Sequence, residues 1–392
     1  MGRTLRIAVV AACPFPARRG TPVRIQRLSE ALADRGHQVV VFTYPFGDGL
    51  PLPSVKVRRA AGLPGYKFLG PGPTAGKLLG LDWLLAHKTW HGLRREPFDL
   101  IHAHHYEGLL VALLARPAGL PVVYDAHTLL ETELPSYWPA LFPPIGRHAG
   151  RILDRWLPAK ADFVVAVSQK IAERVIADGR VTREQVCVAT NGVEPEFFAL
   201  AQRTLNPGEP ASRIVFTGNL GPHQGIDYMV DSFALVASRI PSARLQIITN
   251  DDAHSLAARV AQLGLADRVE ITLGDLEELP RRLSRAHVAV NPRPVGDGVP
   301  QKLLNYMAAG LPIVSFAGTA FELQHEVTGL LVANGDTGAL AEAILRCLRD
   351  TQLADRLGAA ARSEAQLSYR WSASAEVLED VFYRIAARRR GR

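Results

Sequence analysis

The stretch from Asn291 to Gly310, NPRPVGDGVPQKLLNYMAAG, carries residue types that together could bind a phosphate group. Arg293 lies in a turn rich in glycine and proline, and Lys302 lies in the first turn of the helix expected to follow. The N-terminus of a helix presents free N–H groups and a positive dipole end, which the two cations would reinforce. An ordinary strand-to-helix turn with solvated charges is the competing explanation for this stretch taken alone.

The flanking residues predict the strand and the helix that would position these cations. Ala286–Val290 is a short, valine-rich apolar run, typical of a buried strand. Pro300 suits the first position of a helix, where its missing N–H costs nothing. Gly310 stands where a C-cap belongs. The apolar positions between them follow helical spacing: Leu303, Leu304, Met307 and Ala308.

The length and charge of the chain restrict its class. At 392 residues with 47% hydrophobic residues, it is long enough for two domains, each with its own core. The net charge of +7 predicts an anionic partner, which could be a phosphorylated substrate, nucleic acid or an acidic lipid surface. The chain lacks a basic helix or an aromatic-lined strand face, so we expect no nucleic-acid partner.

Cysteine usage and hydropathy bear on location. The three cysteines, Cys13, Cys187 and Cys347, are widely separated and odd in number, which fits a reducing cytosol better than a disulfide framework. No apolar run reaches the roughly 18–20 residues needed to span a bilayer. The sequence therefore predicts a cytoplasmic protein, with peripheral attachment to the inner face of the cell membrane as the alternative.

Strand and helix patterns alternate along the chain, which predicts an α/β fold with two doubly wound parallel sheets. The polar linker 199–212, rich in proline and glycine, marks the boundary between domains 1–198 and 199–370. A ligand would lie in the cleft between the domains, at the carboxyl ends of both sheets. The expected strands are 5–12, 37–43, 99–103, 121–125, 163–168, 186–190, 214–217, 244–249, 269–273, 286–290 and 312–316.

Residues 46–98 form an insertion rich in glycine, proline and lysine, which we expect to be loosely structured apart from an amphipathic helix at 77–85. Such a segment could dock on lipid headgroups or cover an acceptor, and a plain surface loop is the alternative. The C-terminal ARRRGR is open to the same two interpretations, a membrane-contacting tail or a solubilising end.

The order of motifs resembles the GT-B glycosyltransferases of the retaining type called family 4. The resemblance implies two Rossmann-like domains facing across a cleft, the first for the acceptor and the second for a nucleotide sugar. It also implies retention at the anomeric carbon, no bound metal, and a last helix, 371–392, that packs back on the first domain. The matching motifs are Pro16–Thr21, GHQVVVFT, DLIHAHH, YDAH, FVVAVS, TNGVEPEFF, FTGNLGPHQGIDYMV, VNPRP with PQKLLNYMAAGLPIV, and TGLLV.

The resemblance also assigns roles to single residues. Gly20 matches the glycine that approaches the donor phosphates and the reacting sugar. His127 matches a histidine near the transferred sugar, with a structural histidine capping a strand end as the alternative. The two glutamates of the family, seven residues apart, fall on Asp297 and Asn305. Asp297 keeps a carboxylate for sugar hydroxyls, whereas Asn305, at the ribose position, keeps only hydrogen-bonding capacity.

A second departure concerns the donor phosphates. The arginine and lysine that the family places after the first strand of the second domain are replaced by Asn219 and Gln224. We expect Arg293, Lys302 and the N–H groups around 298–301 to neutralise the diphosphate instead. The predicted catalytic residues are His127 and Asp297. The predicted donor-binding residues are Gly20, Gly218, Asn219, Gln224, Arg293, Gly298, Val299, Pro300, Gln301, Lys302 and Asn305.

The expected activity is transfer of a sugar, with retention, from a nucleotide diphosphate sugar to a hydroxyl acceptor. The donor is a substrate, and neither a permanently bound cofactor nor a metal is expected. A lipid-linked or cell-envelope glycan and a small molecule are both open as acceptors. The neutral Asn219, Gln224 and Asn305 favour the alternative, a non-transferring GT-B protein such as a sugar-nucleotide isomerase or a donor-binding subunit.

Overall fold

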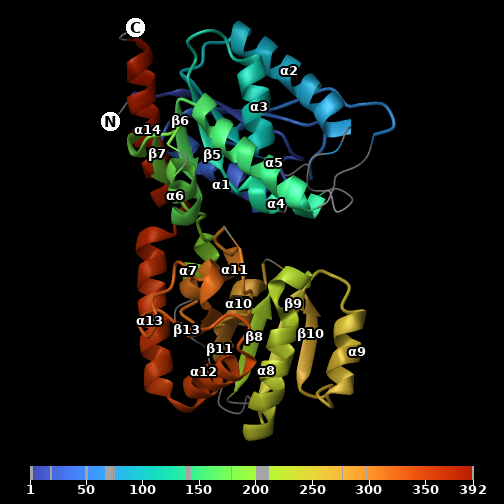
Figure 1. The fold of residues 1–392 in the computed structure, drawn as a ribbon. Coiled ribbons are helices and arrows are strands. Elements are labelled where there is room, and N and C mark those ends of the chain that lie inside the picture. Colours follow the sequence, from blue (N-terminus) through green and yellow to red (C-terminus); the bar gives the residue numbers. More distant parts are fainter. Residues whose placement is uncertain are drawn as a thin grey trace. The chain divides into compact units, whose positions relative to one another are not determined.

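The computed structural model describes residues 3–17, 20–48, 52–66, 74, 76–137, 143–177, 179–199, 212–275, 277–296 and 298–390. The chain divides into two compact units, Met1–Asn191 with Trp371–Arg392, and Gly192–Arg370. Each unit is built on one parallel sheet with helices packed against it (Figure 1). The predicted α/β class with two doubly wound sheets is therefore confirmed.

The sheet of the first unit has the strand order β3-β2-β1-β4-β5-β6-β7, all parallel among the described residues. Its inner strands are continuous runs of Val, Ile and Ala that are buried on both faces, as a doubly covered parallel sheet requires. The strands are β1 Arg6–Ala11, β2 Gln38–Thr43, β3 Lys56–Arg59, β4 Leu100–His104, β5 Val122–Ala126, β6 Phe163–Ala166 and β7 Val186–Val188.

Helices cover this sheet on two sides, and the alternation along β1 shows the two cores. Ala8 and Val10 face the core shared with α2 and α3, whereas Ile7 and Val9 face the core shared with α1 and α14. The helix α14 thus belongs to the first unit, where it packs beside α1 (Figure 1). The helices are α1 Gly20–Asp34, α2 Asp82–Arg95, α3 His105–Ala115, α4 Leu130–Tyr137, α5 Pro143–Trp156, α6 Gln169–Ala177 and α14 Trp371–Arg390.

The sheet of the second unit has the order β10-β9-β8-β11-β12-β13, again parallel. Its strands are β8 Arg213–Thr217, β9 Arg244–Thr249, β10 Val269–Leu273, β11 Val288–Asn291, β12 Ile313–Phe316 and β13 Leu330–Val332. Its helices are α7 Pro195–Ala199, α8 Ile226–Arg239, α9 His254–Gln262, α10 Leu279–Ser284, α11 Gln301–Ala308, α12 Thr337–Arg349 and α13 Thr351–Ser368. The strand order reverses between β8 and β11, which is the switch point where doubly wound sheets bind ligands.

The boundary between the units differs from the predicted one at 198/199. The chain passes into the second unit at Gly192, because the N–H of Val193 donates to the carbonyl of Tyr369 (2.8 Å) and Phe197 is buried in the second unit's core. The linker residues 200–211 lie outside the described part of the chain.

The insertion 46–98 is more regular than the sequence suggested. It contributes β3 to the sheet, and a π-helical turn at Lys77–Leu81 continues directly into α2. Its residues 49–51, 67–73 and 75 lie outside the described ones. Among the described helices, none is long and apolar enough to cross a membrane.

A glycine in α13 tests how tightly this helix packs on α11. A Cβ placed on Gly358 would lie 2.2 Å from the carbonyl oxygen of Gly310, and backbone cannot yield easily. We predict that Gly358→Ala destabilises the protein by about 1–3 kcal/mol, although alanine normally favours a helix. Urea unfolding followed by far-UV circular dichroism measures this. Gly338→Ala in α12, where a Cβ makes only ordinary contact, is the control, and equal stability of both variants would contradict the packing.

Candidate functional site

In the second unit, two glycines bring the turn after β8 against the turn after β11. The chain leaves β8 through Gly218, whose φ is 138°, and enters the short 3-10 helix Pro222–Gln224. Gly225 follows with φ 72°, and a Cβ there would lie 2.0 Å from the carbonyl oxygen of Pro292. Only glycine permits this approach. The two loops that the sequence analysis singled out therefore meet at the carboxyl edge of the sheet.

Lys302 joins these loops, because its side chain extends from α11 into the β8 turn. Its Nζ donates a 2.7 Å hydrogen bond to Oε1 of the buried Gln224 and lies 4.0 Å from the centroid of the Phe216 ring. The position of a Cβ on Gly218 would be 3.4 Å from the same Nζ. A cation thus stands beside Gln224, at the position where the resemblance leads one to expect a lysine or arginine.

The electrostatics of this corner favour an anion. Burial, and then the charge of Arg293, lower the pKa of Lys302 from 10.5 to about 7. Burial also lowers the pKa of His223, with further contributions from Arg293 and Lys302. Arg293 therefore raises the cost of charging both Lys302 and His223. A bound diphosphate would reverse that effect by supplying negative charge.

The N-terminus of α11 contributes backbone groups more than side chains. The helix begins at Gln301 with Pro300 as the N-cap residue, and the N–H groups of its first turn have no acceptor four residues earlier. The Gln301 amide nitrogen donates to the carbonyl of Gly192 (2.8 Å) and lies 3.4 Å from Oδ1 of Asn305. The side chains of Val299 and Pro300 are buried. A ligand could therefore meet the backbone of these residues, but the Gln301 and Asn305 side chains are engaged within the unit.

Asn219 and Arg293, two further predicted residues of this unit, make hydrogen bonds within their own turns. Asn219 is exposed, and its Oδ1 accepts a hydrogen bond from the N–H of Gly221 (3.2 Å). Arg293 is half-buried, and its Nε donates to the carbonyl of Val295 (3.1 Å). Asp297 lies outside the described residues, so its role as a sugar-binding carboxylate stays a prediction.

In the first unit, the predicted site is built around a buried ion pair between α1 and β5. Both oxygens of Asp125 accept hydrogen bonds from Arg24, each at 3.0 Å, and both side chains are almost fully buried. Arg24 also donates to the carbonyls of Ala189 (2.8 Å) and Thr190 (3.0 Å) and to Oδ1 of Asn191 (3.1 Å). Every donor direction of the guanidinium is therefore used, as burial of this cation demands.

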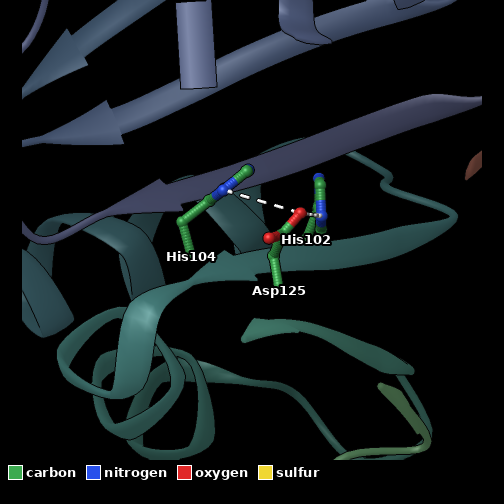
Figure 2. Close-up of side chains that lie close together, drawn as sticks. All are labelled: His102, His104 and Asp125. Atoms are coloured by element: carbon green, nitrogen blue, oxygen red, sulfur yellow. Dashed lines mark hydrogen bonds and ion pairs between the residues drawn. The ribbon is translucent and has the colours of Figure 1, made fainter. Parts of the chain in front are cut away.

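Histidines surround the same carboxylate. Nε2 of His102 lies 3.2 Å from Oδ2 of Asp125, and Nε2 of His127 lies 3.2 Å from Oδ1. His104 points at the same group, with its Nδ1 3.1 Å from Nε2 of His127 (Figure 2 shows His102, His104 and Asp125). Burial alone would raise the pKa of Asp125, but Arg24 and the histidines hold that pKa well below its usual value.

The same burial keeps His104 and His127 neutral. Burial lowers the pKa of His127 to about 4 despite the neighbouring Asp125, and it lowers the pKa of His104 well below its usual value. His127 is therefore a neutral imidazole near pH 7, and it would act through hydrogen bonding and not as a charged acid.

His102, His104 and Asp125 are of metal-ligating types, and their ligand atoms lie within 4.8 Å of one another. The arrangement nevertheless fits a metal poorly, because the Arg24 guanidinium already binds both carboxylate oxygens. A metal ion would have to displace that cation from a buried site. We therefore assign no metal to this cluster.

Gly20 and His127, both predicted from the sequence, are brought close together. Gly20 is the first residue of α1, and a Cβ on it would meet no atom within 4 Å. Oγ1 of the adjacent Thr21 lies 3.3 Å from Nδ1 of His127. Both ring nitrogens of His127 therefore have polar neighbours, and the contact with Thr21 is the longest of them.

Sequence reasoning missed Arg24, His102, His104 and His223. Two signals could have found the ion pair. Asp125 ends an otherwise apolar strand, PVVYD, and Arg24 lies next to Ile25 in the apolar stripe of its helix. A carboxylate and a cation that the pattern places in buried positions are expected to pair. His223 had no comparable signal, since it stands in a turn.

Comparison with known proteins agrees with the fold. The family model of Glycosyltransferase Family 4 matches residues 18–197, and the model of Glycosyl transferases group 1 matches residues 211–350. A D-inositol 3-phosphate glycosyltransferase of Nocardia farcinica is 26% identical over 417 residues, covering 97% of this chain and 89% of that protein.

Among solved structures, sucrose-phosphate synthase of Thermosynechococcus elongatus matches 98% of this chain and 100% of its own, with a TM-score of 0.76 and 21% identity. Anabaena HepE in complex with UDP matches 97% of this chain and 100% of its own, with a TM-score of 0.72 and 19% identity. The two sheets and the switch-point site define the GT-B class. The chain belongs to the family 4-like glycosyltransferases and transfers a sugar from a nucleotide sugar to an acceptor. The alternative of a non-transferring protein has no support among these relatives.

Replacing Arg24 tests whether the ion pair organises the first unit. Arg24→Met leaves the Asp125 carboxylate buried without its main partner, so we predict a loss of about 3–5 kcal/mol in the free energy of unfolding. Arg24→Met with Asp125→Asn removes both charges and should recover part of that loss. Urea unfolding at neutral pH measures the three proteins.

Arg27→Met, on the same helix but in a partly exposed pair with Glu30, is the control and should change stability by about 1 kcal/mol or less. Equal effects of Arg24→Met and Arg27→Met would contradict the assignment.

Proposed function

We propose that the protein transfers the sugar with retention of configuration at the anomeric carbon, from a nucleoside diphosphate sugar to a hydroxyl group. The second unit binds the donor and the first unit binds the acceptor. The observation that carries the proposal is the position of Lys302, whose Nζ reaches Gln224 in the turn after β8. Asn219 and Gln224 are neutral and cannot balance the charge of the diphosphate. Lys302 supplies the positive charge that they lack.

The leaving diphosphate needs its negative charge neutralised as the bond to the sugar breaks. Lys302, Arg293 and the backbone N–H groups of Gly298 and Gln301 supply this stabilisation. Preorganised donors of this kind require little rearrangement during the reaction, which is why they favour the transition state over the ground state. The sugar ring develops a positive charge as the bond breaks, and nearby oxygen atoms stabilise that charge.

Sugar hydroxyls are the proposed ligands of Asp297 and His127. The support for His127 is its neutral imidazole and its 3.3 Å contact with Thr21, a hydrogen bond that a sugar hydroxyl could replace. Gly20, which has open space at its Cα, lets the reacting sugar approach the backbone. No carboxylate of the described residues is placed as a nucleophile, so we assign none.

We propose that transfer needs no metal, because Lys302 and Arg293 provide the positive charge that a divalent cation supplies in other diphosphate sites. Turnover measured with and without a chelator tests this. The base and sugar of the donor are tested by isothermal titration with UDP-, GDP-, ADP- and dTDP-sugars, starting with UDP because the Anabaena structure holds it.

The proposed acceptor is a lipid-linked or cell-envelope glycan, and the proposed location is the cytoplasm with peripheral attachment to an anionic membrane surface. The net charge of +7 supports this attachment. A small polyol is the alternative acceptor, because the Nocardia relative is named for D-inositol 3-phosphate. Turnover with each acceptor type, compared at one donor concentration, separates the two.

Replacing Lys302 tests the donor site directly. We predict that Lys302→Met lowers kcat by roughly 100- to 1,000-fold, the usual cost of removing one preorganised group from a developing charge. Arg293→Gln should lower it in the same direction. Arg281→Gln, which removes an exposed cation of the same unit, is the control and should leave turnover unchanged.

The pKa of Lys302 gives the same test a second readout. In the free protein this amine is largely neutral at pH 8, because its pKa is about 7. A bound diphosphate raises that pKa, so binding should take up a proton at pH 8. Isothermal titration of the nucleoside diphosphate in buffers of different ionisation enthalpy measures the uptake. The uptake should fall sharply in Lys302→Met, and the same uptake in both proteins would contradict the role of Lys302.

A further inference from the structure

Helix α5, Pro143–Trp156, leaves an apolar stripe in contact with solvent. Ile145 is 55% exposed, Ile152 46% and Trp156 45%. With about 100° between successive residues of an α-helix, these three side chains fall within an arc of about 40°. Scattered exposed apolar residues are normal on a protein surface, but three large ones on a single line of one helix are not.

The opposite side of α5 is the one that packs on the protein. A Cβ on Gly150 would lie 2.4 Å from the carbonyl oxygen of Leu130, so the helix is in backbone contact with α4 there. Asp154, on the same side, accepts hydrogen bonds from the N–H groups of Leu130 (2.9 Å) and Glu131 (2.8 Å). Figure 1 shows α4 and α5 side by side in the first unit. This contact fixes the orientation of α5, and the apolar stripe faces away from it.

Cations lie beside the stripe near its C-terminal end. Arg155 is exposed and lies next to Ile152 on the helix surface. Arg151 is paired with Glu131 (2.5 Å), and Arg147 falls on the side of Asp154. Arg180 adds a fourth cation, with its guanidinium carbon 3.5 Å from the centroid of the Trp156 ring. Asp154 is the acidic residue of α5, and its oxygens are turned to the backbone of α4. The outward surface of α5 is therefore apolar and basic.

We propose that this surface of α5 docks on an anionic lipid membrane, with Ile145, Ile152 and Trp156 entering the headgroup region and Arg155 and Arg180 contacting lipid phosphates. An apolar face next to a basic face is the pattern of helices that lie in the membrane interface. Trp156 suits that depth because its ring is apolar and its N–H polar. This inference rests on the proposed function only in that it names the surface for the membrane attachment proposed there.

Two other occupants fit the surface less well. A second copy of the chain would bring the same arginines against each other, and like charges repel. A stable protein–protein interface takes about 20–30 residues on each side, whereas this stripe is a single line of apolar residues about 16 Å long. Lipid phosphates complement the arginines, and insertion needs no wider apolar face.

Vesicle sedimentation of the full chain, without donor or acceptor, tests the surface. Wild-type protein should bind phosphatidylcholine vesicles containing about one-third phosphatidylglycerol far better than pure phosphatidylcholine, and salt should weaken that binding. The triple variant Ile145→Ser, Ile152→Ser and Trp156→Ser should lose affinity at least about ten-fold. Lipids brominated in their chains should quench the part of the tryptophan fluorescence that Trp156→Phe removes.

A matched control removes three comparably exposed leucines from the second unit, Leu235→Ser, Leu263→Ser and Leu367→Ser, and should bind vesicles as wild type does. Equal binding by the α5 variant and wild type would overturn the proposal, as would absence of wild-type binding to the anionic vesicles. A wild-type dimer that the α5 variant converts to a monomer would identify the surface as a self-interface instead. Donor binding is measured separately without vesicles, so either proposal can fail alone.

Discussion

The double negative charge of a diphosphate is the constraint on which this account of the protein depends. The resemblance to family 4 leads one to expect two cations in the turn after β8, but Asn219 and Gln224 stand there instead. Lys302 reaches the same turn from another element, α11, and lies on Gln224 and Phe216. At about 1.4 kcal/mol per pKa unit, the free protein disfavours the charge of this lysine by several kcal/mol. A bound anion would offset this cost and restore the charge of Lys302.

In the first unit, the charge that must be balanced belongs to the protein itself. A carboxylate at the carboxyl end of β5 is buried, and burial of an unpaired charge would be prohibitive. Arg24 binds both of its oxygens and also the backbone at 189–190, so one side chain ties α1, β5 and the segment after β7 together. His104 and His127, which lie beside Asp125, are kept neutral by the same burial. The positions of His127 and Gly20 therefore follow from this ion pair.

Much of the fold could be predicted because its signals are local. Continuous valine- and isoleucine-rich runs predicted the inner strands, and the alternation with amphipathic helices predicted parallel sheets. The short edge strands β3 and β13 were not predicted. Lys56–Arg59 is polar and partly exposed, and Leu330–Val332 has only three residues. The unit boundary at Asn191 was not predicted either, because the hydrogen bond between Val193 and Tyr369 joins residues far apart in the sequence.

The candidate site, like the fold, could be predicted only where its signals are local. The turn holding Arg293 and the helix opened by Pro300 could be predicted from residue types and spacing. The partners of Lys302 could not, because Gln224 and Phe216 lie about 80 residues earlier, and only the folded sheet brings them together. Similarly, Gln301 was predicted at the donor, but its side chain contacts the carbonyl of Gly192, a long-range contact that no local pattern encodes.

The most direct measurement is a crystal structure of the protein with a nucleoside diphosphate bound. We predict that a terminal phosphate oxygen lies within about 3 Å of Nζ of Lys302, with the first-turn N–H groups of α11 directed at the same phosphate. Phosphates bound away from the turns after β8 and β11, with Lys302 still on Gln224, would contradict it.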